Sequence, residues 1–203
     1  MHQRLLRSFE LLDLQEKIAK IMNMLSANGY TIRIKDSKCK YVNIYYTKDG
    51  VDYAFVVIKS RETGELIACH IIDADTEKEL RSLGCMININ NKDRKTNKVR
   101  YKCDGGKTKL NMFLHTFVMQ NVPKKLEDTQ VDHICHSYFI HTKEMLKHCT
   151  AKENNNNKKG KSGYVQMVDY ENTWYAYMLY RLLGVPKTEL DIYQRNCITR
   201  GIV

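Results

Sequence analysis

Residues 30–72 read YTIRIKDSKCKYVNIYYTKDGVDYAFVVIKSRETGELIACHII, and this stretch decides the fold class. Four of its segments are rich in β-branched and aromatic residues, which favour strands: 31–34, 41–46, 53–58 and 66–72. Asp49-Gly50 and Thr63-Gly64 lie between the last three segments and are typical of tight turns. Short connections of this kind join antiparallel neighbours, so we expect an antiparallel strand region over residues 30–110.

A helical pattern precedes the strands. Apolar residues recur at three- and four-residue spacings from 4 to 27, which predicts one amphipathic helix. Asn28-Gly29 follows this pattern and favours the left-handed backbone that ends many helices. The predicted N-terminal unit is therefore residues 1–29, with the helix packed on the rest of the chain.

The remaining elements are shorter. We predict a helix over 76–83 with Asp75 or Thr76 as its cap, because short polar side chains accept hydrogen bonds from a first turn. The other predicted elements are strands at 85–90 and 98–103, a turn at Asp104-Gly105-Gly106, a linker at 160–163, a hairpin of 164–168 with 174–177, and a helix over 187–196. Trp174 could stack on nucleic-acid bases, but we expect it to pack in the core. Together these elements predict an α+β fold.

The composition is that of an ordinary globular protein. The chain has 203 residues, of which 43% are hydrophobic and 28% charged, and no apolar run approaches the roughly 20 residues of a membrane-spanning helix. We also expect no signal peptide, because the N-terminus lacks a long apolar segment. Seven scattered cysteines without a Cys-x-x-Cys pair favour a reducing compartment over a disulfide network, so we expect a cytoplasmic protein.

The positive charge is concentrated in two stretches. Residues 92–109 carry a net charge of +6 and residues 143–163 a net charge of +4, which together equal the +10 of the whole chain. Clustered cations suit a polyanion, although a solvated lysine-rich loop has the same composition. We predict that nucleic acid binds at residues of these stretches: Lys92, Arg94, Lys95, Lys98, Arg100, Lys152, Lys158, Lys159 and Lys161.

Histidines are concentrated in one region. Four of the seven lie between 133 and 148, close to Asp132 and to two cysteines. A structural zinc site usually brings its ligands in close pairs on rigid turns. Here Cys135-His136 and His148-Cys149 are adjacent residues, whose side chains point in different directions on a regular element. Structural zinc therefore stays an alternative, which elemental analysis would test.

A second combination consists of Asp132, His133 and Asn154. The first two end a predicted strand, and Asn154 lies on the first turns of a helix that begins near Thr150. Mg²⁺ or Mn²⁺ takes oxygen ligands and retains waters, so an aspartate, an asparagine and a substrate phosphate suffice to hold it. A neutral imidazole can take the proton of an attacking water. Because neighbours on a regular strand face opposite sides, Asp132 and His133 reach one phosphate only if the strand bends.

These residues belong to a longer pattern: LHTFVM at 114–119, VDHI at 131–134, EML at 144–146 and TAKENNNN at 150–157, with Asn154 following His133 by 21 positions. The pattern resembles the HNH endonucleases of phages and mobile introns, including homing endonucleases. The resemblance implies a ββα-metal module over 111–160, with Asp132 and Asn154 as ligands of one Mg²⁺ or Mn²⁺ and His133 as general base. Residues 161–203 resemble, over 163–177, the AP2-like DNA-binding hairpins that often follow such modules.

Two positions depart from the family pattern. Met145 stands where the family has its middle asparagine, which braces the hairpin loop by hydrogen bonds, and Thr116 stands where an arginine is usual. His141 or His136 could brace the loop instead of the asparagine. We expect His115 to be a structural residue of the hairpin core.

Two functions follow from this pattern. The first is a metal-dependent HNH endonuclease that hydrolyses phosphodiester bonds of double-stranded DNA and nicks one strand per site. The alternative, which Met145 favours, is a catalytically weak or idle HNH-fold protein of a phage that binds nucleic acid or inhibits a host protein, such as a defence nuclease.

Overall fold

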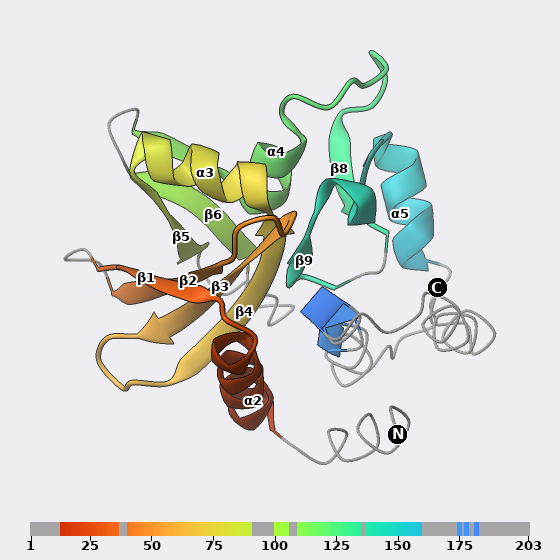
Figure 1. Cartoon of the computed structure of the whole chain (residues 1–203). Coiled ribbons are helices and arrows are strands. Elements are labelled where there is room, and N and C mark those ends of the chain that lie inside the picture. The colour runs from red at the N-terminus through yellow and green to blue at the C-terminus, as the bar shows by residue number, and fades with distance from the viewer. Residues whose placement is uncertain are drawn as a thin grey trace.

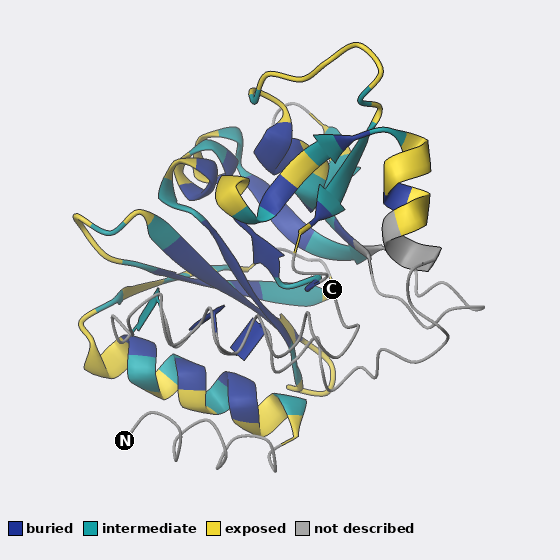
Figure 2. Cartoon of the chain, turned by 90° about the vertical axis from the view of Figure 1, so that its right-hand side faces the viewer, coloured by how far each residue is buried: buried dark blue, intermediate teal, exposed yellow. Residues whose placement is uncertain are grey.

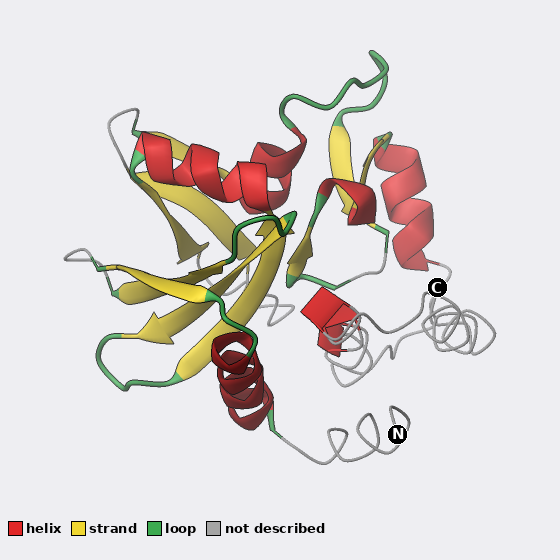
Figure 3. Cartoon of the chain, viewed as in Figure 1, coloured by secondary structure: helices red, strands yellow, loops and turns green. Residues whose placement is uncertain are grey.

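The computed structural model describes residues 13–36, 40–90, 100–105, 109–134 and 137–159, together with positions 174, 175, 177, 178, 181 and 182. These residues form helices and mostly antiparallel strands (Figure 3), so the predicted α+β class is confirmed. Two sheets and a two-stranded hairpin lie among four α-helices and one 3₁₀ helix of the described ranges.

The largest sheet has five strands in the order β1-β2-β3-β4-β9. Its first four strands are β1 (Thr31–Lys35), β2 (Tyr41–Thr47), β3 (Tyr53–Ser60) and β4 (Leu66–Asp73). They form an antiparallel meander, as the sequence predicts, with Gly50 and Gly64 in the left-handed region at two turns. The fifth strand, β9 (Ile140–His141), pairs in parallel with β4.

Helix α2 (Leu14–Ala27) begins later than the sequence pattern predicts. Asp13 has extended backbone angles and caps the helix, because its carboxylate accepts the Glu16 N–H while the Glu16 carboxylate accepts the Asp13 N–H. One continuous helix over 4–27 is therefore wrong, since Asp13 has extended backbone; the part of this prediction over 4–12 lies outside the described residues. The end is as predicted: Asn28 is the cap and Gly29 has a φ of +76°.

The second sheet is an antiparallel meander of β5 (Cys85–Asn90), β6 (Arg100–Gly105) and β7 (Leu110–Phe113). Helix α3 (Ala74–Leu83) precedes it, and its N-cap is Asp73 rather than Asp75 or Thr76. Asp104 and Gly105 lie within β6, so the turn predicted there is wrong at those two positions. The second difference arises because pairing with β5 and β7 extends β6 through Gly105.

The two faces of the five-stranded sheet support separate cores. Helix α2 packs on one face and α3 with the second sheet on the other, and strand residues alternate between them, as with Phe55 and Val56 (Figure 2). Trp174 is fully buried in the core under α2, as predicted. Positions 174, 175, 177 and 178 are helical, so the strand predicted for 174–177 is wrong. Residues 160–173 and 183–203, which hold the predicted linker, first hairpin arm and last helix, lie outside the described residues.

Among the described helices, none is both long enough and apolar enough to cross a membrane.

Candidate active site

The region predicted to carry chemistry forms a β-hairpin with a helix beside it (Figure 1). Strand β8 (Gln130–His133) pairs antiparallel with β10 (Leu146–Cys149), so that Asp132 lies opposite Lys147. Helix α5 (Ala151–Lys159) follows β10 directly and packs on β8, and α4 (Leu114–Met119) packs against both strands. In space β8, β10 and α5 therefore lie together beside Asp132 and His133, although β9 and the 3₁₀ helix come between β8 and β10 along the chain.

A capping box starts α5. The Glu153 N–H donates to Thr150 Oγ1 at 3.1 Å, and Glu153 Oε2 accepts the Thr150 N–H at 2.8 Å. The Thr150 N–H and the Thr150 hydroxyl both donate to the Glu153 carboxylate, and these two bonds hold the pKa of the Glu153 carboxyl below its usual range. Asn154 is the next residue. The cap fixes where the helix begins, and this determines that the Asn154 side chain lies on the side of α5 that faces β8.

Asn154 faces the strand and not the solvent. It is only 8% exposed, although the five described neighbours on its helix are exposed, and its side-chain amide donates to Gln130 Oε1. Gln130 and Asp132 are two positions apart on β8, so they share a strand face. Helix α5 therefore carries Asn154 against the face of β8 that bears Asp132.

The donor set on this face fits a hard divalent cation. Asp132 has carboxylate oxygens and Asn154 an amide oxygen, which are the kinds of ligand atom that such a cation prefers, and the hydrogen bond of Asn154 to Gln130 uses the amide nitrogen. Within the described ranges, no three His, Cys, Asp or Glu side chains are arranged to hold a metal ion. Cys135 and His136, which the zinc alternative needs, lie outside the described residues.

His133 lies on the opposite face of β8 from Asp132, as strand geometry requires. It is 8% exposed, and its Nε2 lies 3.4 Å from Nδ1 of His141. The rings of His115 and Tyr138 have centroids 5.5 and 5.8 Å from its own. The structure therefore keeps the Asp132 carboxylate and the His133 imidazole on opposite sides of the strand, and it does not bring the two side chains into contact with each other.

His141 and His70 extend this arrangement into the interior. His141 is on β9, and its Nε2 lies 2.8 Å from the Tyr138 carbonyl oxygen. Burial, with smaller contributions from His70 and His115, lowers its pKa well below the usual value. His70, on β4, is fully buried with its ring centroid 5.1 Å from that of His141, and burial lowers its pKa to about 3. The sequence motif does not include His70, because this residue lies far upstream, in a strand that is buried along most of its length.

His115 and His148 contact residues that lie around the hairpin. His115 is half-buried on α4 and stacks on Phe113 with an interplanar angle of 8°. His148, on β10, lies 3.2 Å from the carbonyl oxygens of both Met119 and Val122, so it joins the second strand to the end of α4.

Met145 does not supply the side-chain hydrogen bonds that the HNH resemblance assigns to an asparagine at this position. It ends the 3₁₀ helix η1 (Lys143–Met145), and its partly buried side chain packs against the core under α2. Its backbone closes the loop instead, because the Met145 N–H donates to Thr142 and the Ile134 N–H donates to Met145, both at 3.0 Å.

The described cations near the hairpin are few. Lys152 is exposed on the first turn of α5, and Lys147, which the predicted binding set omits, is exposed opposite Asp132. Arg100 begins β6, and Lys158 and Lys159 end α5, with only their backbones described. The other predicted contacts lie outside the described residues: Lys92, Arg94, Lys95, Lys98 and Lys161.

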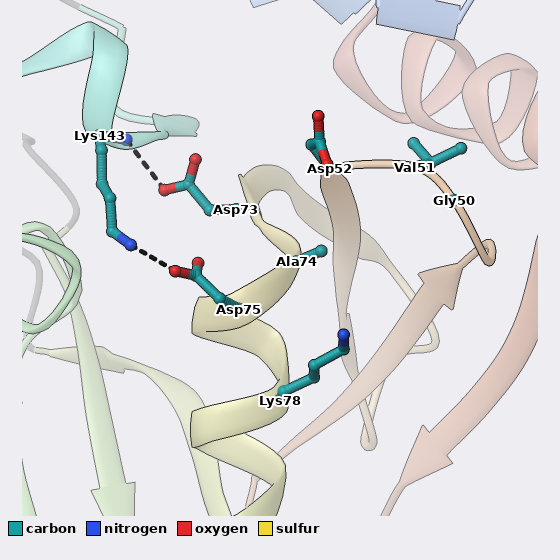
Figure 4. A pocket seen from close by; sticks show the side chains of 8 residues that line it. All are labelled: Gly50, Val51, Asp52, Asp73, Ala74, Asp75, Lys78 and Lys143. Atoms are coloured by element: carbon teal, nitrogen blue, oxygen red, sulfur yellow. Dashed lines mark hydrogen bonds and ion pairs between the residues drawn. The ribbon is translucent and has the colours of Figure 1, made fainter.

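An open pocket of about 460 Å³ lies at the start of α3 (Figure 4). Its lining includes Asp52, Lys78 and three residues that bond to one another: Asp73 accepts the Lys143 backbone N–H at 2.9 Å, and the Lys143 ammonium pairs with Asp75. Burial raises the pKa of Asp73. None of the predicted site residues lines this pocket, and its polar contacts attach η1 to α3.

Comparisons with known family models, with curated proteins and with solved structures found no match to this chain. The HNH resemblance, with the roles it implies for Asp132, His133 and Asn154, therefore stays a prediction from the sequence.

Proposed function

We propose that this protein is a metal-dependent HNH endonuclease that cuts one strand of double-stranded DNA. The observation that carries the proposal is the burial of Asn154, 21 positions after His133, against the strand that bears Asp132 and His133. Asp132 and His133 end β8, and Asn154 of α5 is buried against the Asp132 face of the same strand.

The residues divide the chemistry between them. Asp132 and Asn154 would hold Mg²⁺ or Mn²⁺ through oxygen atoms. When bound, the ion supplies positive charge that stabilises the phosphate and the departing 3′ oxygen. His133 takes the proton of the attacking water, since a neutral imidazole is a competent base near pH 7. Lys147 and Lys152, which are both exposed, would contact flanking phosphates, and the activity would belong in the cytoplasm.

Plasmid cleavage tests the proposal. Supercoiled plasmid with Mg²⁺ or Mn²⁺ should be converted to the relaxed form by the wild type, whereas His133→Ala should bind DNA with nearly unchanged affinity and leave it supercoiled. Asp132→Asn should lose the metal-dependent cleavage. Glu127→Gln, the same charge change at an exposed position of the preceding loop, should cleave like the wild type. Equal cleavage by His133→Ala and the wild type would refute the assignment.

A second candidate is an idle HNH-fold protein that binds nucleic acid or a host protein. Three observations favour it: His133 is 8% exposed, the Asn154 amide bonds to Gln130, and Met145 packs in the core where the family has an asparagine. Metal affinity separates the two candidates. A rise in melting temperature with Mn²⁺ that disappears in Asp132→Ala supports the enzyme, and DNA binding without any Mn²⁺ effect supports the idle protein.

A further inference from the structure

The hydrogen bonds of His141 determine which of its ring nitrogens carries the proton. Nε2 lies 2.8 Å from the Tyr138 carbonyl oxygen, and a carbonyl can only accept. His141 is buried at 2% exposure, and burial keeps its imidazole neutral by lowering the pKa. A neutral imidazole has one N–H, so the proton is on Nε2 and Nδ1 has the lone pair.

This lone pair faces the predicted general base. His141 Nδ1 lies 3.4 Å from Nε2 of His133, and since the first nitrogen can only accept, the second must donate. We propose that His141 is a positioning residue that holds His133 as the Nε2–H tautomer, with the lone pair on Nδ1 as the site that takes the proton of the attacking water. The catalytic part of this inference rests on the proposed nuclease function, whereas the tautomer does not.

The five-stranded sheet fixes His141 in place. His141 is the second residue of β9 and pairs with Ile72 of β4, and its ring lies against that of His70 from the same strand. The sheet thus holds the connection between β8 and β10, and with it the acceptor nitrogen, so the strand region before residue 110 has a direct link to the site. His141 would thus supply a side-chain hydrogen bond at the site, which Met145 cannot do in place of the family asparagine.

Nitrogen NMR of the histidine rings tests the tautomer directly. At pH 8.5, ¹⁵N shifts of the wild type should show His133 protonated on Nε2 and unprotonated on Nδ1. His141→Asn should keep this pattern, because the amide oxygen can replace Nδ1 as acceptor, whereas His141→Leu should give a mixture of tautomers. His148→Leu removes a histidine of the same hairpin that has other partners and should leave the His133 pattern unchanged.

Cleavage kinetics test the consequence. His141→Leu should lower kcat by about 10- to 100-fold with little change in KM for DNA, the usual cost of losing a group that orients a site residue, and His141→Asn should recover much of this loss. A wild-type His133 protonated on Nδ1, or unchanged kcat and tautomer in His141→Leu, would overturn the inference. If His141→Leu does not fold, the wild-type spectrum and His141→Asn still decide. The predicted tautomer in a wild type that never cleaves DNA would refute the nuclease and leave the tautomer established.

Discussion

The rings of His70, His141, His133 and His115 form a histidine cluster, in which each lies near the next. His70 is its most deeply buried member. Its ring packs edge-on against Tyr101 and Phe139, with centroids at 4.1 and 5.6 Å. Neither ring nitrogen has a hydrogen-bond partner among the described residues. An unpaired buried polar group costs about 1–3 kcal/mol, so His70 is a destabilising residue in a well-packed aromatic site.

We expect acid to destabilise the fold through His70. Its pKa is about 3 in the folded state and near 6.5 when unfolded, so between these values the unfolded chain binds the extra proton. The free energy of unfolding should therefore fall as the pH decreases below about 6.5, by about 1.4 kcal/mol per pH unit from this group. Urea unfolding at pH 7 and pH 5 measures the effect, to which His141 adds in the same direction.

His70→Leu should separate this residue from the others that titrate. The variant removes the unpaired nitrogens with little change in volume, so it should be at least as stable as the wild type at pH 7. Between pH 7 and pH 5 it should lose about 2 kcal/mol less than the wild type, which is the share of one histidine over 1.5 units. Parallel losses in the two proteins would show that His70 is not the acid-sensitive group.

At the scale of elements, two helices begin with the same device. Asp13 and Glu16 start α2, and Thr150 and Glu153 start α5. Helix α2 also buries an apolar stripe of Ile18, Ile21 and Leu25, whereas α5 has Asn154 as its only buried residue among those whose side chains are described. The position of α5, and with it the candidate metal ligand, therefore depends more strongly on its cap.

We expect Thr150→Ala to loosen α5 and weaken metal binding. Loss of an N-cap side chain costs about 1 kcal/mol, and with little packing to compensate, the first turn should fray. Hydrogen exchange of the α5 amides should accelerate, and the melting-temperature rise with Mn²⁺ should shrink. Asp13→Ala is the matched control, since it should lower stability without changing exchange in α5. Equal α5 exchange in the two variants would contradict this account.

At the scale of the whole molecule, strands and side-chain contacts cross the boundaries of the predicted units, which are 1–29, 30–110, 111–160 and 161–203. Strand β7 begins at Leu110 and crosses one boundary, and β9 of the third unit pairs with β4 of the second. Trp174, from the last unit, packs its ring against Phe139 at 5.2 Å. The two cores lie on opposite faces of one sheet, so neither can unfold alone without exposing the other.

Unfolding should therefore be a single cooperative transition. Trp174 is the only tryptophan of the chain and is fully buried, so its fluorescence reports the core under α2. Circular dichroism at 222 nm reports all helices and strands. We expect the two signals to give the same midpoint in urea, and a separate midpoint for fluorescence would mean that this core unfolds independently. Trp174→Phe, which changes the probe and keeps an aromatic ring, should leave the dichroism transition single.

The sequence by itself determined the features that depend on neighbours within a few residues. The four strands of 31–72 followed from β-branched and aromatic content and turn glycines, the end of α2 from Asn28-Gly29, and the placement of Asn154 on a first helical turn from Thr150. Asp13 shows how such signals can also be overlooked, because its cap lay hidden within a longer apolar periodicity.

Only the tertiary structure decided which distant side chains meet. His70 and His141 lie side by side because β9 adds in parallel to β4, and Asn154 bonds to Gln130 because α5 turns back onto β8. Helical and strand periodicity act over three to five residues, whereas these contacts depend on sheet register and on which face a returning element covers. Local sequence patterns predict neither of these, so the contact of His70 with the later histidines could be identified only in the folded structure.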